Sequence, residues 1–148
     1  MGEINFESSS VQSHLSILQG VINRMAANSA GCKTWCIALV SAIVVVIADK
    51  GRPELVLISA LPVVLLFFLD AYYLALEGLF RDKYNSFVKK VHTREAKVED
   101  VFIVVPGTGT KTILWETLKA FSSLSVWPFY SGLALMLTAI KWWVLPTP

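Results

Sequence analysis

One carboxylate, Asp70, lies inside an otherwise uncharged apolar stretch of 22 residues, from Leu55 to Leu76. A charge inside such a stretch is costly in a membrane, so the residue is expected to face other helices or water and to have a partner. Lys33, at the edge of the preceding apolar stretch, is the natural partner, with Arg24 second. Two roles stay open: a structural clamp between helices, or an acid that lines and gates a pore in an oligomer.

Three further polar side chains extend the pattern around Asp70. Tyr73, Glu77 and Arg81 follow it at steps of three, four and four residues, so the four share one helical face. Glu77 and Arg81 have the favourable spacing for an ion pair along a helix. We therefore predict an intramembrane polar cluster made of Asp70, Lys33, Arg24, Tyr73, Glu77 and Arg81.

A second candidate is the stretch VFIVVPGTGTKT, residues 101–112, which resembles a phosphate-binding loop. That loop requires a glycine directly before its lysine, but here Thr110 precedes Lys111. About 40 residues between apolar stretches also cannot build the multi-strand sheet that nucleotide folds use. We interpret the segment as a strand followed by a turn, and an isolated strand must find a neighbouring subunit or partner protein to pair with. The strand comprises Val101, Phe102, Ile103, Val104 and Val105.

The sequence offers little for catalysis or metal binding. Cys32 and Cys36 lie four residues apart, whereas structural zinc needs four ligands and both histidines are distant in sequence. We expect both cysteines to be packed thiols. No nucleophile and base have supporting context, so the sequence predicts no enzyme, no metal and no cofactor.

These residues must be positioned by apolar segments, which dominate a chain that is 55% hydrophobic and 16% charged. A membrane-spanning helix needs about 20 apolar residues. Leu55–Leu76 and Ala120–Ile140 meet that length, and Thr34–Ala48 nearly does once its flanks are counted. We predict an all-α membrane protein with three transmembrane helices. The first two form a tight hairpin across residues 49–54, and Pro62 kinks the second.

Basic residues indicate the orientation. Ten of the 13 lysines and arginines lie in the N-terminal segment and in the connection 77–119, and three lie on the other side. The positive-inside rule then places the N-terminus and this connection in the cytoplasm and the C-terminus outside. The connection also carries six acids, so we expect no direct nucleic-acid binding.

The N-terminal segment contains a stripe of apolar residues at steps of four and three, which predicts an amphipathic helix. This stripe could lie on the membrane surface or pack against other copies of the chain, and we favour self-association. Its members are Val11, Leu15, Leu18, Ile22 and Met25.

The predicted organisation has four parts. Residues 1–33 form the cytoplasmic amphipathic helix, and residues 34–76 form the transmembrane hairpin. Residues 77–119 form a cytoplasmic stalk with the small strand-containing segment. Residues 120–148 form the third span and a short outer tail.

The runs NRMAANSAGCKTW, residues 23–35, and FFLDAYYLALEGLFRDKY, residues 67–84, resemble a group of small bacterial inner-membrane proteins of unassigned function. The organisation is also similar to the SLATT class, two-span effectors proposed to damage membranes in bacterial conflict systems. A third span distinguishes this chain from a plain two-span effector. The matching positions are Arg24, Met25, Asn28, Ser29, Lys33, Trp35, Asp70, Tyr72, Tyr73, Leu74, Glu77, Phe80, Arg81 and Tyr84.

The resemblance implies a role in antiviral defence at the bacterial inner membrane. The expected function is that of an oligomeric effector or channel-like protein that perturbs the membrane and is triggered through its cytoplasmic face. The alternative is a non-conducting anchor that recruits a soluble defence effector. The expected partners are the lipid bilayer, other copies of the chain and a cytoplasmic sensor protein.

Overall fold

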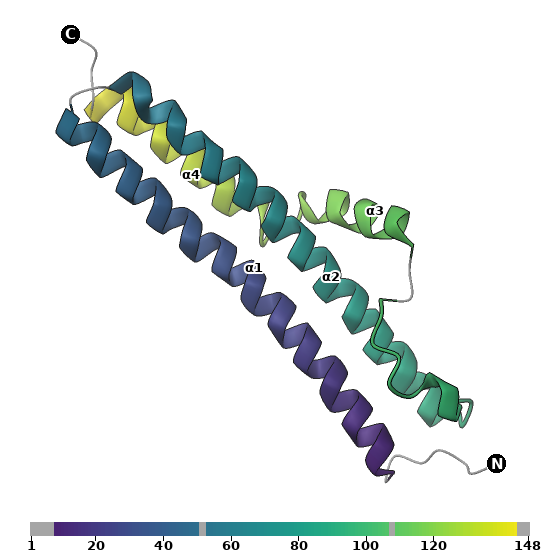
Figure 1. Ribbon diagram of the computed structural model, residues 1–148. Helices are drawn as coiled ribbons and strands as arrows, with labels where there is room; N and C mark the ends of the chain where they lie inside the picture. Colours follow the sequence, from purple (N-terminus) through teal and green to yellow (C-terminus); the bar gives the residue numbers. More distant parts are fainter. Residues whose placement is uncertain (1–7, 51–52, 107–108, 145–148) are drawn as a thin grey trace.

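The computed structural model describes residues 8–50, 53–106 and 109–144, and the regular elements in these ranges are all helical (Figure 1). Two long helices, α1 and α2, run antiparallel over most of the molecule, and α3 and α4 pack on α2. The α-helices are α1 (Ser9–Lys50), α2 (Ala60–His92), α3 (Thr110–Ala120) and α4 (Trp127–Ala139). The other elements are the 3-10 helices η1 (Pro53–Ser59) and η2 (Val98–Asp100) and the π-helix η3 (Ile140–Val144).

Helix α1 joins the predicted amphipathic helix and the first apolar stretch in one unbroken element of 42 residues, about 60 Å long at 1.5 Å per residue. Its sequence contains no proline. The run Ile43–Ile47 is entirely β-branched and favours strands in water. In an apolar environment, however, a helix satisfies its own backbone hydrogen bonds, which explains why the run is helical.

Helix α2 begins after η1, and Pro62 is only its third residue. Ser59, directly before α2, has helical backbone, so η1 and α2 form one continuous helical segment. Pro62 therefore lies where the 3-10 helix changes to an α-helix. Gly51 and Arg52, in the predicted tight turn, lie outside the described residues.

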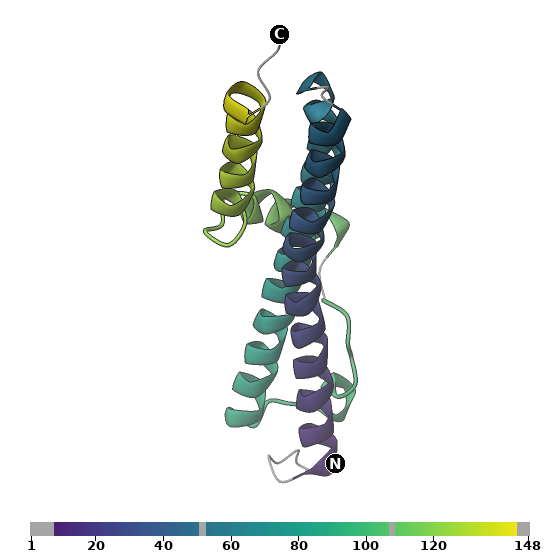
Figure 2. The ribbon, with the colours of Figure 1, turned by 90° about the vertical axis from the view of Figure 1, so that its left-hand side faces the viewer.

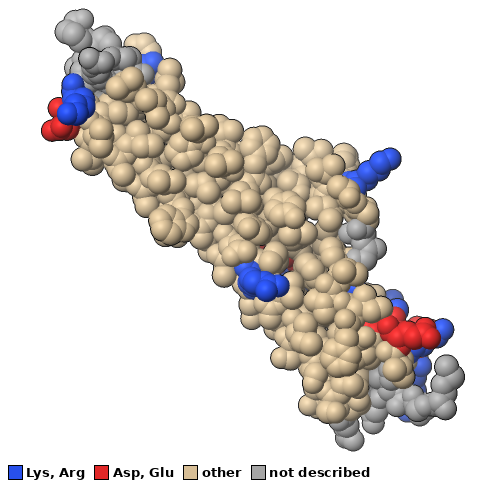
Figure 3. Space-filling view, viewed as in Figure 1, with Lys and Arg blue, Asp and Glu red and all other residues tan. Residues whose placement is uncertain are grey.

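Two helices in the described chain, α1 and the segment Leu55–His92, are long and apolar enough to cross a membrane. Only 22% of the most apolar window of each is buried within the protein. The core helix of a soluble protein would be mostly buried, so these two windows do not resemble such a core helix. Figure 3 shows the surface between the charged hairpin tip and the charged opposite end. The visible face there is largely uncharged.

The prediction of three transmembrane helices is wrong. The third apolar stretch, Ala120–Ile140, is divided: residues 121–126 form turns, and α4 has only 13 residues, about 20 Å. Pro128, in the first turn of α4, favours a helix start there, and the three serines between Phe121 and Val126 favour turns. Helix α4 packs beside the half of α2 nearest the hairpin tip (Figures 1 and 2).

The predicted strand is also wrong. Residues 101–105 form turns and irregular backbone, and Phe102 has a left-handed φ of 67°. The two long helices supply hydrogen-bond partners that a strand would have sought elsewhere: the Phe102 N–H donates to His14 Nδ1, and Lys83 Nζ donates to the Val105 carbonyl. Gly107 and Thr108 of the following turn lie outside the described residues.

The N-terminal apolar stripe packs within the chain. Val11 joins Phe87 and Val91 of α2 in one cluster, and Leu18 and Ile22 join Phe80 in the next. Leu15 and Met25 are partly buried at the edges of these clusters. As folded, the stripe is covered by α2, so a contact between copies would have to use another face.

Candidate functional site: a buried charge clamp

The predicted partners Lys33 and Asp70 join the two long helices. Lys33 Nζ lies 2.6 Å from Asp70 Oδ2. Ser29, one turn before Lys33 on α1, donates a hydrogen bond of 2.5 Å from its Oγ to Asp70 Oδ1. Oδ1 thus accepts a hydrogen bond from α1, whereas Oδ2 forms an ion pair with Lys33 without a hydrogen bond of good geometry, and we call Ser29, Lys33 and Asp70 the clamp.

The clamp is closed on the side of the acid. Asp70 is 0% exposed, and the Lys33 side chain is 21% exposed. A carboxylate removed from water is stable as an anion only if charged or hydrogen-bonding groups replace the water. Ser29 and Lys33 supply these groups, while the lysine retains partial access to the surroundings.

Small side chains allow α1 and α2 to approach closely around the clamp. Cys36 of α1 and Ala71 and Ala75 of α2 are buried in the same cluster. Cys32 is buried as well, and both cysteines are free thiols. Among the described residues, no three histidine, cysteine or acidic side chains lie in a group that could hold a metal ion.

Helix α4 covers the clamp from the hairpin-tip side. The Tyr130 hydroxyl donates to the Leu66 carbonyl at 3.1 Å, one helical turn from Asp70. The Phe67 ring stacks on Phe121 with centroids 4.8 Å apart and meets the Tyr130 ring edge-on at 5.3 Å. These contacts cover the tip side of the clamp, and Phe121 and Tyr130 both come from the divided third apolar stretch.

The other predicted members of the polar cluster lie outside the clamp. Arg24 is exposed and takes part in none of the ion pairs between described residues. Tyr73 is partly buried, with its ring against Tyr72. Glu77 and Arg81 form the expected pair along α2, with Arg81 Nε donating to Glu77 Oε1 at 2.8 Å.

Two members of the site were absent from the predicted cluster. Ser29 precedes Lys33 by four residues and so shares its helical face, a signal that the sequence does carry. Tyr130 is 60 positions beyond Asp70, and no spacing rule connects them.

A second polar site lies at the other end of the hairpin, outside both apolar stretches. His14 of α1 is fully buried, and its ring meets the rings of Phe87 of α2 and Phe102 edge-on. Since the Phe102 N–H donates to Nδ1, the imidazole proton is on Nε2, which has no hydrogen-bond partner in the described structure. Burial lowers the pKa of His14, the charge of Lys83 lowers it further, and Asp100 opposes them.

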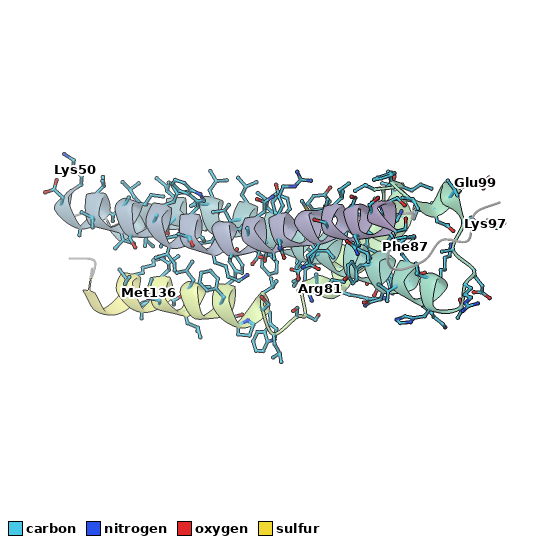
Figure 4. All side chains as sticks on the ribbon, turned by 90° about the horizontal axis from the view of Figure 1, so that it is seen from below. Lys50, Arg81, Phe87, Lys97, Glu99 and Met136 are labelled. Carbon is cyan, nitrogen blue, oxygen red and sulfur yellow. The ribbon has the colours of Figure 1, made fainter. Side chains whose placement is uncertain are left out.

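One ion pair and one backbone hydrogen bond hold the segment that covers His14. Lys90 Nζ lies 2.8 Å from Asp100 Oδ1, and the Lys97 backbone N–H donates to Asp100 Oδ2 at 2.9 Å. The hydrogen bond from Lys90 is the main cause that lowers the pKa of Asp100. Figure 4 shows Lys97 and Glu99 at this end of the molecule and Lys50 at the other. We call residues 98–106 the cover segment.

The clamp is an ion pair and a hydrogen bond that join α1 and α2, with its acid inside an apolar stretch. The sequence matches no protein-family model, and neither the curated proteins nor the solved structures include a significant match to it.

Proposed function

We propose that the chain is a non-enzymatic membrane effector or channel-like protein that assembles from several copies in the bacterial inner membrane and perturbs it. The observation that carries this proposal is the clamp. An ionisable pair at membrane depth is costly and generally marks a functional position. Here it joins the two helices that would cross the bilayer.

The surface of the hairpin supports membrane insertion. Large apolar side chains are exposed along both helices near the tip, where a soluble protein would carry polar ones. In a bilayer these side chains contact lipid, and each helix satisfies its own backbone. They include Ile37, Leu39, Val45 and Val46 of α1 and Leu61, Val64, Leu65 and Phe68 of α2.

The charge distribution supports one orientation. The clamp end of the hairpin continues into the basic N-terminal segment and connection, so this end lies in the cytoplasm by the positive-inside rule. The hairpin tip then lies outside. Residues Lys141 and Trp142 line a groove together with Val56 and Leu57, so this part of the chain lies beside the hairpin tip.

Opening the clamp would produce the perturbation. If a cytoplasmic event separates α1 from α2, the ion pair between Asp70 and Lys33 breaks. Both charges are then exposed at membrane depth. Water and ions then follow these charges, and the cost falls when several copies share one polar path. The partner or sensor protein acts on the extended cytoplasmic ends of α1 and α2. The defence setting is supported by the resemblance to SLATT-type effectors.

The test compares wild type with a chain in which the clamp is replaced by apolar side chains, Lys33→Met with Asp70→Leu. Both are expressed in bacteria to equal levels in the membrane fraction, and membrane potential is followed with a fluorescent dye. We expect wild type to depolarise cells and the double variant to leave them polarised. Arg24→Gln is the control and should behave as wild type. Equal depolarisation by the double variant would remove the clamp from the mechanism.

The second candidate is a non-conducting membrane anchor that recruits a soluble effector. Asp70 favours it, because the acid is fully buried between helices of one chain and does not line an open path there. This candidate is preferred if wild-type cells stay polarised at high expression and during phage infection. A chain that is strictly monomeric in mild detergent would also contradict the oligomeric proposal.

A further inference from the structure

Helix α3 packs on α2 through a face of mixed character, which includes Glu116 with its side chain 33% exposed. Ile113, Glu116, Thr117 and Ala120 recur at steps of three, one and three residues, and all four are buried or half-buried. Glu116 and Ala120 line a groove with Leu74 and Gly78 of α2. The face of α3 that meets the protein is thus largely small or polar.

The opposite face of α3 carries its largest apolar side chains. Leu114, Trp115 and Leu118 are 60%, 59% and 57% exposed. Leu124, in the turn after α3, is 85% exposed on the same stretch of chain. A surface helix in water would turn these side chains toward α2. Here they face away from the rest of the protein.

The level of α3 along the hairpin indicates what this face meets. The groove between α3 and α2 is lined on α2 by residues from Leu74 to Asp82, a range that includes the end of the apolar stretch at Leu76. Phe68, Leu69 and Tyr72 of α2 are also exposed, just before this point of the chain. Helix α3 crosses α2 instead of following it (Figure 1).

Lysine and tryptophan are combined as they are at membrane interfaces. Lys119 Nζ lies 5.6 Å from the centre of the Trp115 ring and 2.7 Å from Glu116 Oε1. Tryptophan favours the headgroup level of a bilayer, and a lysine beside it directs its charge toward water.

We propose that α3 is an in-plane interfacial helix whose outer face, Leu114, Trp115 and Leu118, inserts into the lipid of the cytoplasmic leaflet. The inference rests on the membrane insertion proposed above and adds a third point of attachment. It places a lipid contact directly after the cover segment and so connects movement of the cytoplasmic end to the bilayer.

The experiment measures quenching of tryptophan fluorescence by brominated lipids in reconstituted full-length chain. One variant keeps Trp115 alone, and a matched control keeps Trp35 alone, which is exposed at the start of the apolar part of α1. All other tryptophans are changed to phenylalanine. We expect Trp115 to lose most of its emission with bromine near the headgroup end of the acyl chain and clearly less with bromine near the chain end.

The control separates the two proposals. If Trp35 is quenched and Trp115 is not, the interfacial helix is overturned and the membrane hairpin stands. If neither is quenched, membrane insertion itself fails. If neither bromine nor soluble iodide quenches Trp115 at high protein-to-lipid ratio, and bromine still fails to quench it when the ratio is lowered, a second copy and not lipid covers the face. That result also overturns the inference. The quenching difference between wild type and Trp115→Phe provides the same readout with one substitution.

Discussion

Lys33 of α1 and Asp70 of α2 form an ion pair of 2.6 Å in which the acid is fully buried and the lysine is not. This asymmetry means that the two partners are not equivalent. Lys33 can move its charge toward the interface by bending its long side chain. The Asp70 side chain is too short to move its charge in the same way. The stability of the hairpin therefore depends on a hydrogen-bond donor or cation that stays in contact with the Asp70 carboxylate.

We predict that Lys33→Ala destabilises the hairpin by about 3 kcal/mol, because it leaves a buried carboxylate with Ser29 as its remaining partner. Asp70→Asn should cost less, since the amide can still accept the Ser29 hydrogen bond. Thermal unfolding in detergent, followed by circular dichroism, measures both. Arg24→Ala, at an exposed position without an ion pair, should stay within about 0.5 kcal/mol of wild type.

Replacing both partners with apolar side chains should restore stability. A buried ion pair often contributes no more than well-packed apolar groups of similar volume. We expect Lys33→Met with Asp70→Leu to unfold within about 1 kcal/mol of wild type. A double variant as unstable as Lys33→Ala would show that the site needs its charges for folding, and its loss of activity could then not be assigned to function.

The pairing of Lys33 with Asp70 was predictable, whereas the third member of the clamp, Ser29, was not predicted; an isolated acid in an apolar stretch is conspicuous. Asp70 is the one charge in its apolar stretch, and Lys33 is at a matching depth, so pairing followed from cost alone. Spacing along one helix also predicted Glu77 with Arg81. Such rules act within a helix or between adjacent helices, which is why Tyr130 of α4 could not be placed.

The errors have local causes. A count of apolar residues merges Phe121–Val126 with α4, whereas the serines and Pro128 divide them. The run after Asp100 has strand composition, but His14 and Lys83 bind its backbone from two helices and replace the ladder of a sheet. Tertiary contacts overrode a local preference there, as they commonly do for short strands.

The backbone of Phe102 provides a test of the cover segment. Its φ of 67° is unfavourable for any residue with a Cβ, by about 1 kcal/mol, and is readily adopted by glycine. Phe102→Ala and Phe102→Gly both remove the ring beside His14, but only glycine relieves the strain. Hydrogen exchange of residues 98–106 should therefore show the glycine variant opening less readily than the alanine variant. Equal exchange would mean that the left-handed conformation is not retained in solution.

His14 should make docking of the cover segment depend on pH. Protonation of Nδ1 abolishes the acceptor for the Phe102 N–H, and burial holds the pKa of His14 below its usual 6.5. Between that lowered pKa and about 6.5, the opened segment binds more protons than the docked one. Docking is therefore fully favourable above about pH 6.5 and weakens as the pH falls below it.

The groups that face His14 set the expected controls. Lys83 of α2 disfavours its protonation and Asp100 of η2 favours it, and the pKa of Asp100 is itself lowered, so Asp100 stays charged through this range. Hydrogen exchange of residues 98–106, corrected for intrinsic rates, should increase in wild type between about pH 7 and pH 5.5. His14→Asn keeps an acceptor but does not titrate, so its corrected exchange should stay level. Lys83→Met removes both a charge that lowers the pKa of His14 and the hydrogen bond to the Val105 carbonyl, so exchange should be faster at every pH and should increase less as the pH falls. An unchanged pH profile in His14→Asn would assign the transition to another group.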